Sequence, residues 1–175
     1  MVLQSLFQQV AGKSARAATL IRRLAGAGAI LALAIPVQHA AAGTGGVYVA
    51  GQGAGLDQAF SRALADNPAK SAAPFWVVVA GKEIAKTTKT GASPAVAGWI
   101  KTALDRGGLV YVCRTDMMNA GIREGDLLDG VHSMYGYDAK DWAGLLPARK
   151  EGITLPDNMQ QSQQILKACA GNPKP

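Results

Sequence analysis

The chain has 175 residues, of which 49% are hydrophobic, and its formal net charge is +6. The first 42 residues contain four of the 18 Lys and Arg and none of the 12 Asp and Glu, so the other 133 residues have a net charge of only +2. A charge this small argues against a nucleic-acid-binding surface, and the length suits a single domain with its own core.

Residues 1–42 have the pattern of an export signal peptide. A basic front precedes an apolar run at 24–37, and the small residues at 40–42 offer a cleavage site before Gly43. The apolar run of about 14 residues is shorter than the roughly 20 that span a bilayer, so we expect no stable membrane insertion after cleavage. The leader predicts a periplasmic protein. The general secretory route is favoured, because the twin arginine Arg22-Arg23 lacks the bulky aromatic that normally follows it.

Apolar runs and glycines in the remaining chain predict alternating strands and helices. Continuous apolar runs predict strands at 47–50, 75–80, 109–112 and 131–135, with a short edge strand at 153–155. Helices are predicted at 56–67, from Pro94 to the glycines at 107–108, from Thr115 or Asp116 to Ala120, at 138–146, and after Asp157. We expect 82–91 to be a solvated loop. The order predicts an α/β fold, with a mostly parallel sheet of about five strands and helices on both faces.

The segment Gly51-Gln52-Gly53-Ala54-Gly55 separates the first strand from the first helix. A dinucleotide-binding loop has the spacing G-x-G-x-x-G, whereas these glycines follow G-x-G-x-G. The acidic residue after the second strand, Glu83, also comes too far along the chain. We therefore favour a tight turn in which glycine supplies positive φ angles over a nucleotide-binding loop.

The third predicted strand ends in Cys113, at the edge of the sheet where α/β proteins place their chemistry. A following helix would favour the reactive thiolate, and Arg114 and Thr115 are candidate supports for it, whereas the carboxylate of Asp116 would oppose it. In an exported protein Cys113 can instead form a disulfide with Cys169, or remain a buried, inert thiol. These interpretations stay open on the residues alone, and a labile disulfide would combine the first two.

The sequence contains few other reactive side chains. His132 is the one histidine left after the leader is removed, and a lone histidine is more often a packed or surface residue than a catalytic base. Two cysteines and one histidine are too few for a structural zinc site, which needs four nitrogen or sulfur ligands. The residues therefore argue against a structural metal site.

The chain reads V-Y-V-C at 110–113 and G-I-x-x-x-D-L-L-x-G-V at 121–131. An apolar strand ending in Cys, a short helix, and this turn into the next strand resemble the DsrE/DsrF-like family of sulfur-relay proteins. The resemblance covers about 74–155. It implies a flavodoxin-like domain, here 43–156, and leaves the predicted C-terminal helix and polar tail at 157–175 outside the core domain.

The resemblance implies that Cys113 accepts sulfane sulfur as a persulfide and passes it to a protein or a small sulfur compound, in sulfur-compound metabolism. It also implies a homo-oligomer and no cofactor, with Cys169 as a resolving or disulfide partner. Enzyme status stays open, because a carrier is a substrate of other proteins. The rival interpretation is a non-catalytic periplasmic binding or assembly module with a structural Cys113–Cys169 disulfide.

Overall fold

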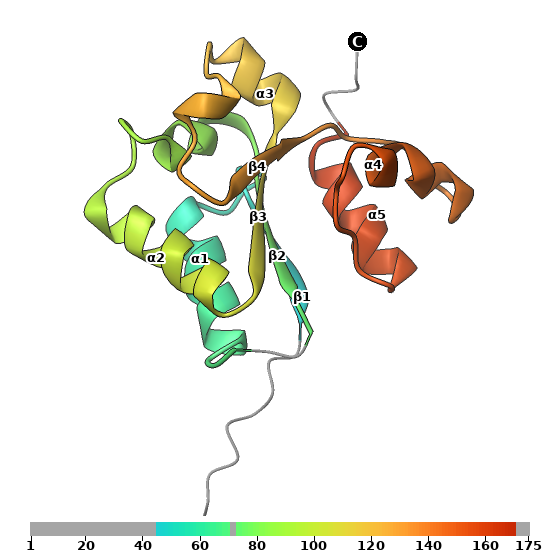
Figure 1. The fold of residues 1–175 in the computed structure, drawn as a ribbon, viewed down its shortest axis with the longest axis horizontal. Coiled ribbons are helices and arrows are strands. Elements are labelled where there is room, and N and C mark those ends of the chain that lie inside the picture. The colour runs from blue at the N-terminus through green and yellow to red at the C-terminus, as the bar shows by residue number, and fades with distance from the viewer. Residues whose placement is uncertain (1–44, 71–72, 171–175) are drawn as a thin grey trace, which may run out of the picture. The chain divides into compact units, whose positions relative to one another are not determined.

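Four parallel strands form one sheet in the part of the chain that the structure describes (Figure 1). The computed structural model describes residues 45–70 and 73–170. The strands are β1 (Gly46–Ala50), β2 (Phe75–Val79), β3 (Gly108–Cys113) and β4 (Val131–Met134), and they lie side by side in the order β1-β2-β3-β4. The predicted α/β fold is confirmed and is consistent with a flavodoxin-like architecture, with four strands rather than about five.

The first face of the sheet is covered by α1 (Leu56–Asp66) and α2 (Pro94–Asp105), on the left of Figure 1. Each crossover moves one strand further in the same direction, and right-handed crossovers of this kind leave their helices on one face. Alternate strand residues point to this face and are fully or almost fully buried: Phe75, Val77, Val79, Val110 and Val112. Ser93 caps α2 by accepting a hydrogen bond from the Val96 amide, as its Ser-Pro start predicts.

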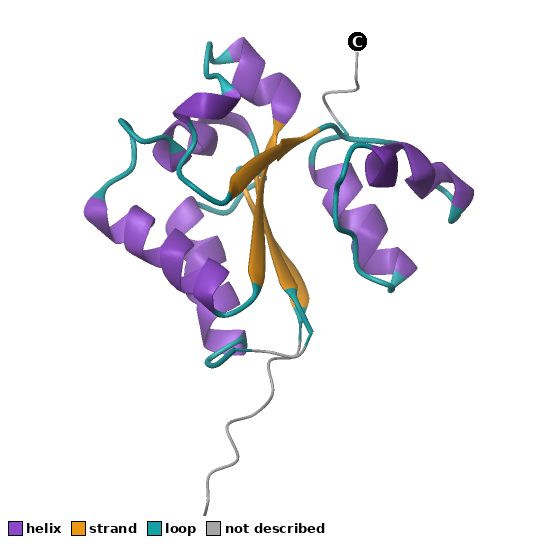
Figure 2. Ribbon diagram, viewed as in Figure 1, coloured by secondary structure: helices purple, strands orange, loops and turns teal. Residues whose placement is uncertain are grey.

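The second face is covered by the C-terminal part of the chain, on the right of Figure 1. Here α5 (Met159–Ala168) packs on β1 and β2 and buries Ile165 and Leu166 completely. Figure 2 draws the shorter α4 (Leu146–Lys150) on the same side of the sheet as α5. A parallel sheet is stable only when both faces are covered, so the C-terminal helix contributes to the core.

The predicted edge strand at 153–155 is wrong. This segment crosses the second face of the sheet without joining it, because two aromatic side chains bond its backbone. The indole N–H of Trp76 donates to the Thr154 carbonyl at 2.9 Å, and the Thr154 N–H donates to the Tyr111 hydroxyl at 3.1 Å. The polar tips of these side chains replace the partners that a neighbouring strand would provide.

Two other predicted segments also differ from the structure. The predicted helix at 138–146 is replaced by a single 3₁₀ turn, η4 (Ala143–Leu145), and then by α4, because Pro147 suits the first turn of a new helix. The predicted solvated loop at 82–91 contains a 3₁₀ helix, η2 (Gly81–Thr87). Ile84 and Thr87 are fully buried there, which ties this segment to the core.

The turn between β1 and α1 has the positive φ angles that its glycines predict. Gly51 has φ +99° and Gly53 has φ +90°. A Cβ on Gly51 would lie 2.1 Å from the Ala80 carbonyl oxygen, whereas a Cβ on Gly53 would have no atom within 4 Å. Position 51 thus needs glycine for two reasons, its positive φ angle and the close approach of Ala80 just after β2. Position 53 needs glycine for its positive φ angle alone.

This difference predicts unequal effects of two matched substitutions. Gly53→Ala should lower the free energy of unfolding by about 1–2 kcal/mol, the cost of a left-handed backbone at an L-residue. Gly51→Ala should lower it by about 3 kcal/mol, because a steric overlap is added. Chemical denaturation of both variants measures the difference, and equal losses would contradict this account of the turn.

Candidate functional site

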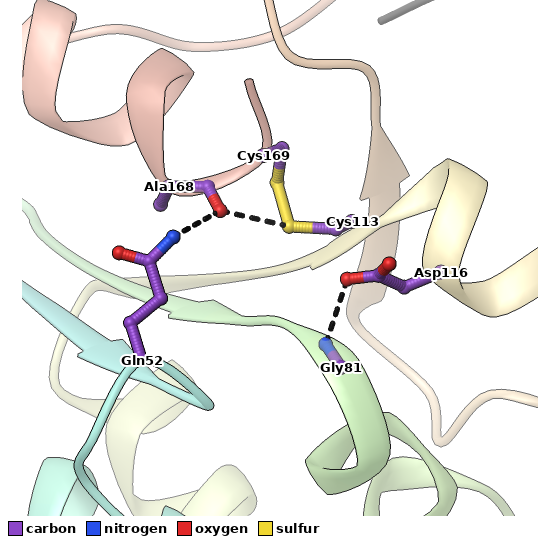
Figure 3. Close-up of a disulfide and its surroundings, with 6 residues drawn as sticks. All are labelled: Gln52, Gly81, Cys113, Asp116, Ala168 and Cys169. Carbon is purple, nitrogen blue, oxygen red and sulfur yellow. Dashed lines mark hydrogen bonds between the residues drawn. A yellow bond between two sulfur atoms is a disulfide. The ribbon is translucent and has the colours of Figure 1, made fainter. Parts of the chain in front are cut away.

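Cys113 is the last residue of β3 and directly precedes α3 (Arg114–Asn119). The helix therefore begins one or two residues before the predicted caps, Thr115 and Asp116, and Cys113 occupies the N-cap position. Asp116 is part of the first turn, and its carboxylate accepts a hydrogen bond from the Gly81 amide at 2.7 Å. This bond joins the start of α3 to the segment that follows β2 (Figure 3).

The structure joins the two cysteines in a disulfide (Figure 3). Trp76, Tyr111 and Cys113 lie on the second face of the sheet, because alternate residues of a strand share a face and the register pairs Trp76 with Leu109. Cys169 follows α5 on the same side, and the two Cα atoms are 5.2 Å apart. The sequence left this pairing as one of several alternatives. The order of strands and helices places both cysteines on the same side of the sheet, where they can bond.

Both sulfurs are inaccessible to solvent. Cys113 is 0% exposed and Cys169 is 1% exposed. The Cys113 sulfur lies 3.6 Å from the Ala168 carbonyl oxygen, which accepts a hydrogen bond from the Gln52 amide at 2.8 Å. A disulfide sulfur has no proton to donate, so the first of these is a close contact rather than a hydrogen bond. Gln52 thus connects the turn after β1 to the last turn of α5.

The loop after β4 also encloses the disulfide. A Cβ on Gly136 would lie 2.2 Å from the carbonyl carbon of Cys169, so this position accommodates only glycine without a shift of the backbone. Neither the spacing of the cysteines nor the local pattern around Gly136 indicated this contact.

The other predicted site residues lie at the start of α3 and on β4. The Arg114 guanidinium lies over the Tyr135 ring, 5.3 Å from its centroid, and Thr115 is half-buried. His132 is exposed on β4, where the register places it beside Tyr111, whereas Met134 is beside Cys113. The structure therefore brings Cys113 together with Cys169 and not with His132.

A polar hollow of about 370 Å³ adjoins this strand end. It is lined by Arg114, Ser133, Tyr135, Glu151 and Ile153. Burial and a hydrogen bond to Glu151 raise the pKa of the nearby Tyr137 hydroxyl to about 12, so this hydroxyl stays protonated at neutral pH. The hollow contains groups of both charges and is a candidate site for a polar ligand.

Glu83 has a role that the sequence did not reveal. Its side chain is buried, and one carboxylate oxygen accepts hydrogen bonds from the Leu56 amide at 3.0 Å and from the Lys86 ammonium at 2.9 Å. The carboxylate thus occupies the N-terminus of α1, where a nucleotide-binding turn would hold a phosphate. The turn at Gly51 to Gly55 is closed by the protein's own anion, which argues against the nucleotide-binding interpretation.

Among residues 45–70 and 73–170, no group of three or more His, Cys, Asp or Glu is arranged to hold a metal ion. None of the helices in those ranges is long and apolar enough to cross a membrane. The predicted leader lies outside the described residues. No family model matches the chain, and comparison with curated proteins and with solved structures found no match.

The disulfide predicts a large effect on stability. Its cysteines are 56 residues apart, and closing a loop of that length in the unfolded chain stabilises the fold by about 4 kcal/mol in the chain-entropy account. The double variant Cys113→Ala/Cys169→Ala should lose roughly this free energy of unfolding in chemical denaturation. Reduced wild-type protein should behave similarly. A double variant as stable as the oxidised protein would contradict the prediction.

Glu83 predicts a dependence of stability on pH. The Lys86 hydrogen bond, together with the Leu56 amide, holds the pKa of Glu83 below its ordinary value of 4.5 despite burial. A carboxyl with a lowered folded pKa stabilises the protein above its unfolded pKa, and this contribution is lost as the pH falls through the folded pKa. Urea unfolding at pH values from neutral to below 4.5 should therefore show a shallower acid loss for Glu83→Gln than for wild type. In Lys86→Met the acid loss should be smaller than in wild type, because the folded pKa of Glu83 then lies closer to its unfolded value. Identical acid slopes in wild type and Glu83→Gln would refute this.

Proposed function

We propose that the chain is an exported α/β module of the periplasm whose role is binding or assembly, with the Cys113–Cys169 disulfide as a structural element. The burial of both sulfurs is the observation that carries this proposal. A reactive or carrier thiol needs an open approach for its partner, whereas a structural disulfide is best protected from one. The oxidising compartment that the leader predicts would preserve such a bond.

The bond stabilises a specific arrangement. It links the end of β3 to the end of α5, the helix that covers the second face of β1 and β2. With α5 fixed in this way, the polar hollow beside Arg114 and the outer surface of α5 become rigid features suited to a partner. Binding through a rigid surface loses less conformational entropy than binding through a mobile one.

A second candidate is sulfane-sulfur transfer through Cys113 in a DsrE-like protein. Two observations favour it: the V-Y-V-C strand end that carries the resemblance, and the position of Cys113 at the carboxyl end of β3 directly before a helix. In this role Arg114 and Thr115 would support the thiolate, and Cys169 would be the resolving partner.

A persulfide of this kind could form from the oxidised protein by exchange of its disulfide with hydrosulfide. Hydrosulfide attacks the Cys113 sulfur, the bond between the two cysteines breaks, and Cys169 leaves as a thiolate. The disulfide is reduced by two electrons and the incoming sulfur is oxidised, so no further oxidant is required. The proton of the hydrosulfide stays on the terminal sulfur or passes to water. The last turn of α5 would have to move first, because both cysteines are buried.

Intact mass and alkylation distinguish the two roles. A structural disulfide predicts a folded protein that is two hydrogens lighter than the reduced chain and resists alkylation until it is treated with strong reductant. It also predicts no added sulfur when the oxidised protein meets hydrosulfide, or the reduced protein meets polysulfide. The mass of protein from the periplasmic fraction also reports whether the chain begins at Gly43.

Two single variants are the controls. Cys169→Ser leaves Cys113 as a lone thiol and shows whether its accessibility alone permits loading. Addition of one sulfur atom to wild-type protein that is absent from Cys113→Ser would overturn the structural role and support the carrier.

A further inference from the structure

The outer edge of β1 presents backbone groups that pair with no other strand among residues 45–70 and 73–170. Ala80 donates its N–H to the Ala50 carbonyl at 3.0 Å, so Ala50 faces β2, and by alternation Tyr48 does too. The N–H and C=O groups of Val47 and Val49 therefore point away from β2. In the part of the chain that the structure describes, β1 pairs with β2 alone. Such an edge is a template for another strand.

The opposite edge of the sheet is blocked. The Ser133 N–H on β4 donates to a Glu124 carboxylate oxygen at 2.9 Å, and the Ser133 hydroxyl bonds the other oxygen. A carboxylate bound to an edge strand discourages the addition of a further strand, a common protection in natural sheets. The sheet is therefore protected at β4 and open at β1.

A groove of about 650 Å³ lies beside the open edge and is lined largely by amides. Its lining includes Val49, Gln52, Gln160, Gln163, Gln164 and Lys167. Gln160, Gln163 and Gln164 belong to the outward side of α5, whose inward side is packed on the sheet, and Gln52 belongs to the turn after β1. Amide side chains both donate and accept hydrogen bonds, so a surface built from them is complementary to a copy of itself. A two-fold interface places this patch against the same patch of the other subunit, so its amides can pair there, and Lys167 is the only charged side chain in the lining.

We propose that a second copy of this chain binds here, with the two β1 strands antiparallel about a two-fold axis at Tyr48. Val47 would exchange two backbone hydrogen bonds with Val49 of the partner subunit, and the symmetric pair would do the same. The two sheets become one sheet of eight strands, and the two glutamine surfaces face each other across the axis. This inference rests on the proposed function, because the disulfide holds α5 beside β1, and it identifies the partner in assembly.

Charge reversal tests the symmetry of the interface. Sedimentation equilibrium of the oxidised chain should show a dimer. Gln160→Lys/Gln164→Lys and Gln160→Glu/Gln164→Glu should each raise the dimer dissociation constant by about tenfold or more, because like charges then face each other. An equimolar mixture of the two variants should recover a dimer. Asn119→Lys, an amide-to-lysine change on the exposed part of α3, is the matched control and should leave the dimer unchanged.

A backbone variant tests the strand pairing. Val49→Pro removes one outward N–H that β2 does not use, and it should abolish the dimer while the circular dichroism spectrum stays that of the folded protein. In wild type, hydrogen exchange at the Val47 and Val49 amides should slow as the protein concentration rises.

Three outcomes would overturn the proposal. These are a monomer at all concentrations, a dimer unaffected by the charge variants, or protection of these amides that does not depend on concentration, which would indicate a different occupant. The alkylation result for Cys113 is measured separately, so failure of the dimer and failure of the structural disulfide are distinguishable.

Discussion

A parallel sheet must be covered on both faces, and here the coverage of the second face depends on one disulfide. The consecutive strand order places α1 and α2 on the first face and leaves the second face to the last helix of the chain. A helix of ten residues such as α5 is marginal in water by its propensity alone. The covalent bond from Cys113 to Cys169 fixes α5 in place and completes the core.

The same bond determines what the strand end can do. Cys113 is at the position where α/β proteins carry reactive groups, yet its sulfur is engaged and enclosed by the last turn of α5 and by Gly136. Chemistry at this sulfur and coverage of the second face are therefore coupled, because access to the sulfur requires α5 to move. This coupling separates a structural module, which keeps the bond, from a sulfur carrier, which must open it.

Side chains of the protein itself also occupy the carboxyl ends of β1 and β2. Glu83 places its carboxylate at the N-terminus of α1, and Asp116 bonds the amide of Gly81 after β2. Two backbone positions that often receive anionic ligands in α/β folds are thus occupied by the protein's own side chains. The open features are elsewhere, in the polar hollow beside Arg114 and along the edge of β1.

The sequence by itself determined the α/β alternation, the places of the four strands, the cap at Ser93 and the positive φ angles at Gly51 and Gly53. These features depend on neighbouring residues, through apolar runs, capping side chains and the conformational freedom of glycine. The tertiary structure decided the pairing of Cys113 with Cys169, the role of Glu83, and the loss of the expected strand at 153–155. Each of these joins residues far apart in the chain: Trp76 and Tyr111 bond Thr154, and Leu56 bonds Glu83. Local patterns contain no information about such contacts, because the folding of the sheet and the path of the last helix create them.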